Sequence, residues 1–326
     1  MIRLAPLDQR LLDEFQRDLP LVPRPFAAMA GELGVEEAEV ITRLAALQAS
    51  GSVARVGATV RPNTAGASTL AALAVPEDRI DEVAALVGAE PGINHSYLRE
   101  DAWNLWFVAT APDAGGLAAC LARIGACTGL RVLDLPLRRA FNIDLGFRLN
   151  GPRAIPGVDR TPDLGALQPG DRPILQALAQ GLPLVERPFA AVADALALPE
   201  AALIDRIAAL AAAGILTRVG VIVRHRAIGW RSNAMVVWDL PASRIPAAGV
   251  ALARHPGVTL CYQRQTVPGV WGYGLFSMIH GQSRAQALAV LAEAAALPEL
   301  AGADHRALFS NRCFKQTGAL LQEAAA

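Results

Sequence analysis

The chain has 326 residues, 53% of them hydrophobic, so it can bury a full core and is long enough for two or more domains. Its 30 basic and 30 acidic residues cancel, so no net charge draws the whole molecule to nucleic acid or to an anionic membrane. No apolar run approaches the ~20 residues that span a bilayer, and the first residues do not read as a signal peptide, so we expect a cytoplasmic protein.

The chain contains a tandem duplication. The stretch LPLVPRPFAAMAGELGV at 19–35 returns as LPLVERPFAAVADALAL at 182–198, and SGSVARVGATVR at 50–61 returns as AGILTRVGVIVR at 213–224. A fixed internal repeat of this length indicates two copies of one folding module. The segment at 150–166, rich in Pro and Gly and without hydrophobic periodicity, predicts the linker between them.

Each copy starts with helices and continues with strands. In the first copy, helical spacing of apolar residues predicts helices at 7–17, 25–33 and 36–49, and the alternation in VARVGATVR predicts the ribbon of a winged helix-turn-helix. The following residues read as a βαββαβ series, which is the ferredoxin-like pattern. Its first members are a strand at 68–75, a helix at 77–89 and strands at 92–99 and 104–110, and a second helix and a closing strand follow.

The predicted fold class is therefore α+β, a tandem repeat of a winged helix-turn-helix plus a ferredoxin-like βαββαβ module. The expected domains, in chain order, are a winged helix-turn-helix at 1–62, a ferredoxin-like module at 63–149, the linker at 150–166, a second winged helix-turn-helix at 167–226 and a second ferredoxin-like module at 227–326.

A winged helix followed by a ferredoxin-like module resembles the leucine-responsive and asparagine-type transcriptional regulators, so DNA binding has to be considered. Duplex binding needs Lys and Arg on phosphates and polar readers near the start of the recognition helix. Here the third helix opens with Glu36, Glu37 and Glu39, and its counterpart at 198–214 is almost wholly Ala and aliphatic. We expect a regulator fold that does not bind DNA.

The stretch NHSYLRED at 94–101 concentrates polar and charged side chains within an otherwise bland sequence. Alternation along a strand places His95, Tyr97 and Arg99 on one face. The second copy aligns Tyr262 with Tyr97 and Arg264 with Arg99 but has Leu260 in place of His95. The two copies have thus diverged at the residue best suited to proton transfer.

The second copy carries its own basic and titrating residues, namely Arg224, His225, Arg226, His280 and Lys315. Arginines with Tyr and His suit a ligand that has several carboxylates and a flat apolar body, because guanidinium groups clamp carboxylates and His works near neutral pH as an acid or base.

Other conspicuous residues have ordinary structural explanations. We expect the aromatic residues Trp103, Trp106, Phe107, Trp271, Tyr273 and Phe276 to be packing residues. His255 reads as a helix-end cap and His305 as a strand-start residue. The four cysteines form no C-x-x-C pair, so we expect buried free thiols and no metal site.

Several long motifs are similar to the two subunits of siroheme decarboxylase, fused into one chain. They are RPFAAMAGELG, RVGATVRPNTAG, PGINHSYLRED and NLWF in the first copy, and RPFAAVADAL, RVGVIVRHRAIGWRSNAMVVW, CYQR and LFSMIHG in the second. The resemblance implies loss of carbon dioxide from the C12 and C18 acetates of siroheme, giving didecarboxysiroheme for the d-type heme of nitrite reductase or for heme by the siroheme route.

Within that resemblance, His95 or His225 is the expected general acid, and Tyr97 is a further candidate proton donor. Carboxylates would be held by Arg99, Arg224, Arg226 and Arg264, with Tyr262, His280 and Lys315 as further substrate-binding residues. No cofactor is expected beyond the iron of siroheme itself. The expected partners are siroheme and its product, a second copy or the internal pseudo-heterodimer, and other heme-biosynthesis enzymes, but neither DNA nor membrane. The alternatives are a transcriptional regulator and a non-catalytic tetrapyrrole-binding protein.

Overall fold

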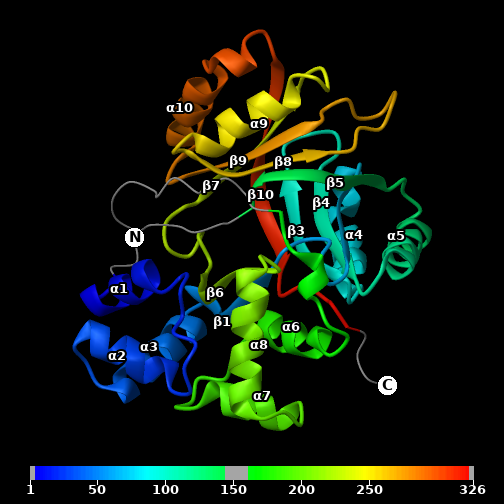
Figure 1. The fold of residues 1–326 in the computed structure, drawn as a ribbon. Coiled ribbons are helices and arrows are strands. Elements are labelled where there is room, and N and C mark those ends of the chain that lie inside the picture. Colours follow the sequence, from blue (N-terminus) through cyan, green and yellow to red (C-terminus); the bar gives the residue numbers. More distant parts are fainter. Residues whose placement is uncertain (1–3, 144–160, 323–326) are drawn as a thin grey trace. The chain divides into compact units, whose positions relative to one another are not determined.

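The computed structural model describes residues 4–143 and 161–322, so most of the predicted linker lies outside the described residues. The described chain forms two compact units (Figure 1). The winged-helix unit contains residues 4–65 and 161–229, and the barrel unit contains residues 66–143 and 230–322. Each unit thus combines equivalent parts of the two copies, whereas the predicted domains follow the chain order.

The winged-helix unit repeats one pattern of three helices and a strand. The first copy supplies α1 (Pro6–Glu14), α2 (Pro25–Leu33), α3 (Glu37–Ala49) and β1 (Val53–Val60), and the second supplies the short helix at Leu164–Ala166, α6 (Asp171–Gln180), α7 (Pro188–Ala195), α8 (Glu200–Ala212) and β6 (Leu216–Val223). Proline opens α2 and α7 because the first helical residue needs no N–H partner. Gly34 ends α2 in the left-handed conformation at φ 73°.

The predicted wing differs from the observed one. Each copy contributes a single strand, and β1 pairs antiparallel with β6, so the ribbon is shared between copies. At its centre Gly57 lies opposite Gly220, and a Cβ on Gly220 would lie 2.5 Å from the Gln16 carbonyl oxygen. The segment between α1 and α2, at Phe15 and Gln16, therefore crosses β6 with the two backbones in contact at Gly220. A side chain at position 220 would prevent this contact.

The barrel unit contains two ferredoxin-like modules, as predicted. The first comprises β2 (Ala67–Leu73), the turn Glu77–Arg79, α4 (Ile80–Ala89), β3 (Ile93–Arg99), β4 (Leu105–Ala111), α5 (Ala114–Thr128) and β5 (Leu133–Asn142). The second comprises β7 (Ser232–Asp239), α9 (Ile245–Arg254), β8 (Val258–Arg264), β9 (Leu275–Gly281), α10 (Arg284–Ala295), the turn Pro298–Leu300 and β10 (Asp304–Gln316).

The two sheets close into one barrel with the strand order β10-β3-β4-β2-β5-β8-β9-β7. Each module's last strand pairs with the other module's second strand, so β5 adjoins β8 and β10 adjoins β3. All neighbours are antiparallel. The starts of β2, β3, β7 and β8 therefore lie at the same end of the barrel as the ends of the other four strands.

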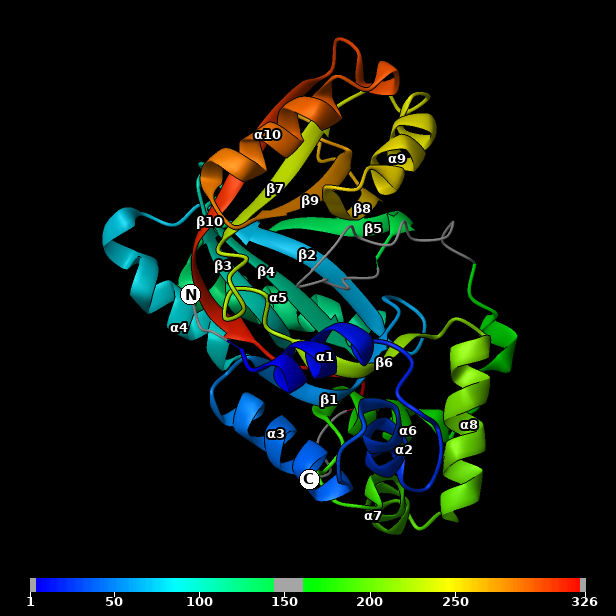
Figure 2. The ribbon, with the colours of Figure 1, turned by 90° about the vertical axis from the view of Figure 1, so that its left-hand side faces the viewer.

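Three apolar clusters fill the barrel unit. One lies between the first module's sheet and the helices α4 and α5, and one lies between the second module's sheet and α9 and α10 (Figure 2). The third takes residues from both modules, including Trp106, Met235, Trp271 and Phe276, and occupies the barrel interior. The expectation that these aromatic residues are packing residues is confirmed.

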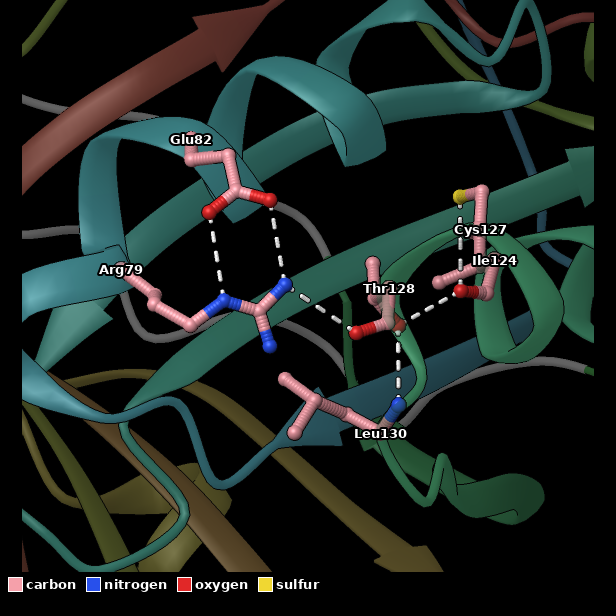
Figure 3. Close-up of polar contacts among 6 residues, drawn as sticks. All are labelled: Arg79, Glu82, Ile124, Cys127, Thr128 and Leu130. Carbon is pink, nitrogen blue, oxygen red and sulfur yellow. Dashed lines mark hydrogen bonds and ion pairs between the residues drawn. The ribbon is translucent and has the colours of Figure 1, made fainter.

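Polar contacts join the start of α4 to the end of α5 (Figure 3). The Arg79 guanidinium donates to both Glu82 carboxylate oxygens, at 3.2 and 3.1 Å, and to the Thr128 carbonyl at 3.3 Å. The Thr128 hydroxyl donates to the Ile124 carbonyl at 2.7 Å and accepts from the Leu130 N–H at 3.3 Å. These bonds satisfy carbonyls in the last turn of α5 and tie the two outer helices of the first module together.

Among the described residues, no helix is both long and apolar enough to cross a membrane.

Candidate functional site

The barrel interior changes character along its axis. Apolar side chains such as Leu70, Leu133 and Leu308 pack its body. Polar residues gather on the interior face near the end where β3 and β7 start and β9 ends. His95, Asn233 and His280 are the main ones, placed there by strand alternation. This end, called the polar end below, has titrating side chains beside the apolar side chains that pack the body of the barrel.

The first strand of the site is β3, and the predicted facing of its side chains is confirmed. His95 lies opposite Val108, and Tyr97 lies opposite Trp106. Directly opposed residues of antiparallel strands share a face, and both partners belong to or pack against the interior cluster. The His95 and Tyr97 ring centroids lie 6.4 Å apart, and the Arg99 guanidinium lies 5.5 Å from the Tyr97 ring centroid.

The second strand of the site is β8, whose matching residues repeat this arrangement. Tyr262 lies opposite Phe276, with ring centroids 5.9 Å apart, and the Arg264 guanidinium lies 4.7 Å from the Tyr262 ring centroid. Leu260 occupies the position of His95 and packs against the interior cluster. The barrel thus has two similar polar strands. They differ at one position, where β3 has the imidazole of His95 and β8 has the aliphatic side chain of Leu260.

Both arginines also hold the barrel together. Arg99 donates to the Leu308 carbonyl on β10 at 3.1 Å, and Arg264 donates to the Leu135 carbonyl on β5 at 2.8 Å. Leu308 and Leu135 occupy matching places in the two closing strands, so each guanidinium bridges its own module to the other.

Arg264 carries a charge that the described residues do not neutralise. Its Nε atom is buried without a hydrogen-bond partner there, and none of the ion pairs among the described residues includes Arg264. Burial lowers the pKa of the guanidinium, while Tyr262 and the more distant Asp134 partly oppose that effect. A cation held in this way is a suitable partner for an incoming carboxylate.

His280 belongs to a buried hydrogen-bonded group at the polar end. Its Nδ1 lies 2.7 Å from the Thr259 hydroxyl, which also contacts the Met278 carbonyl at 2.9 Å. The Asn142 amide donates to the Thr259 carbonyl at 2.9 Å. Thr259 has a single hydroxyl proton, which it donates to the Met278 carbonyl. The Nδ1 of His280 must then carry a proton and donate it to the Thr259 oxygen, which leaves Nε2 as the nitrogen with the free lone pair.

Lys315 lies on the other face of its strand. It is opposite Ser96 on β3, and its ammonium donates to the Gly88 and Glu90 carbonyls at 2.7 and 3.2 Å. These carbonyls lie at the end of α4, where a cation also complements the helix dipole. The structure does not bring Lys315 to the interior face, and its contacts are those of a helix cap.

The remaining predicted site residues belong to the winged-helix unit. The Arg224 N–H donates to the Ser52 carbonyl at 2.9 Å, and its guanidinium lies near Gly51. Arg61, its counterpart in the first copy, donates from Nε to the Gly214 carbonyl at 2.8 Å. His225 is buried, and Arg226 follows it in the turn after β6.

Strand pairing adds residues that the sequence analysis did not include. Cys313 lies opposite Tyr97, and Gln316 lies opposite His95, both on β10 of the second copy. Beside β8, Ala140 lies opposite Tyr262 and is the counterpart of Cys313, whereas Asn142 lies opposite Cys261 and corresponds to Lys315. No sequence signal joins residues more than 200 positions apart, so only the closed barrel reveals them.

The minor expectations have mixed outcomes. His255 caps α9 and accepts from the Gly257 N–H at 3.2 Å, and His305 near the start of β10 packs on Trp238 at 4.9 Å, as expected. Free thiols are confirmed, but only Cys120 and Cys261 are buried, while Cys127 and Cys313 are exposed. Burial raises the pKa of Cys120 to about 11, which makes this thiol unreactive. The described residues contain no cluster of three or more metal-ligating side chains.

Similarity to known proteins covers almost the whole chain. The model of the siroheme decarboxylase NirDL-like HTH domain matches residues 8–53 and 171–216, and that of the AsnC-like ligand binding domain matches residues 65–142 and 227–315. The siroheme decarboxylase NirDL subunit of Paracoccus denitrificans is 66% identical over 98% of each chain. The siroheme decarboxylase NirD subunit of Stutzerimonas stutzeri is 52% identical over 45% of this chain and 96% of its own.

A solved structure agrees with this similarity. The crystal structure of siroheme decarboxylase NirDL with an iron-uroporphyrin III analogue matches with a TM-score of 0.65 and 28% identity, over 96% of this chain and 92% of the other. The fold thus defines a fused pair of AsnC-like subunits whose sheets close into one barrel. The chain belongs to the siroheme decarboxylase family, with the two NirD- and NirL-type subunits joined in one polypeptide.

Proposed function

We propose that this chain decarboxylates siroheme at its C12 and C18 acetate side chains and releases 12,18-didecarboxysiroheme and two carbon dioxide. The observation that carries the proposal is the 66% identity to a siroheme decarboxylase NirDL subunit over 98% of both chains. The product would serve the d-type heme of nitrite reductase or heme made by the siroheme route.

The chemistry needs a held carboxylate and a proton donor. The bond between the acetate methylene and its carboxyl carbon breaks, and the electron pair stays on the methylene, where the macrocycle delocalises it. Carbon dioxide leaves and one proton is added, so the side chain becomes a methyl group with no net oxidation. Positioning and removal of the carboxylate from water lower the barrier.

Residues along the lengths of β3 and β8 and at the polar end suit these two tasks. We assign the general acid to His95, with Tyr97 beside it as a second proton-carrying group, because both rings lie on the interior face of β3. Arg99 and Arg264, the last residues of β3 and β8, are the proposed carboxylate partners at the other end of these strands from His95. Tyr262 is a stacking surface, and His280 is a polar contact at the polar end. His225, with Arg224 and Arg226, is the other candidate set for proton delivery and carboxylate binding. Lys315 is left out because its ammonium caps α4.

The difference between His95 and Leu260 favours one proton-delivering strand. Only β3 presents an imidazole at this position, and only β3 adjoins Cys313 and Gln316. We therefore propose that the β3 side performs the chemistry and that the β8 side binds the remaining carboxylates.

The test measures product mass with each histidine removed in turn. His95→Gln and, separately, His225→Gln are incubated anaerobically with siroheme, and loss of one or two carbon dioxide is followed by mass spectrometry. We expect His95→Gln to lower kcat by about 100-fold or more, the range that general acid catalysis contributes. Full activity in both variants would overturn the histidine assignment.

The regulator alternative is opposed by the charges around the two recognition helices. Arg24 pairs with Glu37 at the start of α3, and Arg187 pairs with Glu200 at the start of α8. Arg24 also lies 3.2 Å from Glu186. Because carboxylates hold these arginines beside the helix starts, phosphate contacts there would cost ion pairs. We expect no salt-dependent retention on DNA.

A tetrapyrrole-binding protein without turnover would change the absorbance of siroheme and leave its mass unaltered. The proposed enzyme changes both. The reaction uses no cofactor beyond the iron already in siroheme, and the proposed partners are siroheme, its product, a second copy of the chain and neighbouring heme-biosynthesis enzymes in the cytoplasm.

A further inference from the structure

The acidic end of the NHSYLRED stretch takes part in neither carboxylate binding nor proton transfer, yet it is attached firmly to the second copy. The Glu100 N–H donates to the Phe309 carbonyl at 3.0 Å, directly after Arg99 has donated to the Leu308 carbonyl. The Glu100 carboxylate accepts two bonds from Arg284, both at 2.8 Å. Asp101 lies 3.5 Å from the Arg306 guanidinium.

The Glu100–Arg284 pair is bidentate, and the Asp101 carboxylate of the second pair is buried. The Arg284 guanidinium lies 3.9 Å from the Phe309 ring centroid, so an aromatic face holds it while both nitrogens meet Glu100. Its hydrogen bonds lower the pKa of Glu100. The Asp101 side chain is 7% exposed and also accepts from the Trp103 N–H at 3.0 Å.

The position of Arg284 in its helix also points to this partner. Arg284 is the first residue of α10, and Ser283 is the N-cap. A cation in the first helical turn opposes the helix dipole, so Arg284 does not stabilise α10 by its charge. Its contacts with Glu100 and Phe309 account for a charge there.

At the opposite seam the same backbone contacts occur, and an arginine there bonds a neutral amide in place of a carboxylate. After Arg264, the Gln265 N–H donates to the Pro136 carbonyl at 3.0 Å, matching Glu100 and Phe309. The Gln265 side chain accepts from Arg138 at 2.6 Å, and Thr266 stands where Asp101 stands in the first copy. Glu100 and Asp101, the two residues that follow β3, therefore form ion pairs with the other module. Gln265 and Thr266, which follow β8, are uncharged and form none. The ion pairs thus belong to the strand that carries His95.

We propose that Glu100–Arg284 and Asp101–Arg306 are positioning pairs that hold the end of β3 against β10 and so align His95 and Tyr97 with the bound macrocycle. The inference rests on the proposed function of His95. Exposed ion pairs add little to global stability, but proton transfer is sensitive to displacements of about 1 Å. Loss of these ion pairs should therefore lower kcat and the local order of β3, and leave the global stability nearly unchanged.

The test compares Arg284→Gln with Arg138→Gln, the matched change at the seam where the arginine bonds the neutral Gln265 side chain. For Arg284→Gln we expect kcat to fall about tenfold with KM changed less than about twofold, because alignment and not binding is lost. Amide exchange in the peptide spanning β3 should become about 2- to 5-fold faster. Arg138→Gln should leave kcat and β3 exchange unchanged. The charge-swapped double variant, Glu100→Arg with Arg284→Glu, should recover most of the lost kcat.

Several results would overturn the inference. Unchanged β3 exchange in Arg284→Gln does so whether or not the wild-type chain releases carbon dioxide, so this arm is independent of the proposed function. Unchanged kcat in an active enzyme also overturns it, as does a loss of kcat that accompanies unfolding of the whole chain. A wild-type chain that binds siroheme without changing its mass would instead refute the proposed function, while faster β3 exchange would still support the clamp.

Discussion

Replacing Arg264 by Met should weaken siroheme binding strongly while leaving the folded state almost as stable as before. The guanidinium donates to the Leu135 carbonyl at 2.8 Å and stacks on Tyr262, yet its Nε atom is buried with no hydrogen-bond partner among the described residues. Met keeps much of the side-chain volume and removes the charge.

The magnitudes explain why the two effects separate. Loss of the charged hydrogen bond costs about 1.5 to 3 kcal/mol, and loss of the stacking on Tyr262 costs about 0.5 to 2 kcal/mol. Removal of a desolvated cation returns several kcal/mol, so the free energy of unfolding should change by about 1 kcal/mol or less. A bound carboxylate loses its charged partner with no such compensation, so Kd for siroheme should rise about 100-fold.

The assay pairs a urea unfolding curve with an absorbance titration of siroheme, on Arg264→Met and on the matched Arg99→Met. A loss of more than about 3 kcal/mol of folding stability in Arg264→Met, together with an unchanged Kd, would show that Arg264 is a barrel staple and refute the reasoning.

Two further predictions concern the winged-helix unit. Gly220→Ala should lower the free energy of unfolding by about 2 to 4 kcal/mol, because its Cβ would lie 2.5 to 2.6 Å from backbone atoms of Phe15 and Gln16. The control, Gly31→Ala in α2, has open space around the new Cβ and should be neutral or stabilising by about 0.5 to 1 kcal/mol in the same thermal melts. Burial raises the pKa of Asp171, but bonds from Arg206 and the Gln168 N–H outweigh it and the net pKa is lowered. The stability that this pair adds is therefore full above the unfolded pKa of about 3.9 and is lost as pH falls through the folded value. Asp171→Asn should cost about 2 to 4 kcal/mol at pH 7 and flatten the acid limb of stability against pH, and an unchanged acid limb would count against the pair.

Local sequence patterns determined much of the architecture. Helical spacing and the duplication located both winged helices, and strand alternation placed His95, Tyr97 and Arg99 on one face, because side-chain direction along a strand depends only on neighbouring residues. The acidic start of α3 is likewise visible in the sequence, and the prediction that this regulator fold does not bind DNA depends on it.

Tertiary structure alone decided which residues meet across the two copies. The exchange of closing strands brings Cys313 and Gln316 beside Tyr97 and His95, turns Lys315 away to cap α4, and joins Glu100 to Arg284. These pairings depend on how two sheets close into one barrel. That closure is set by packing between distant segments, which the local patterns of either copy do not encode.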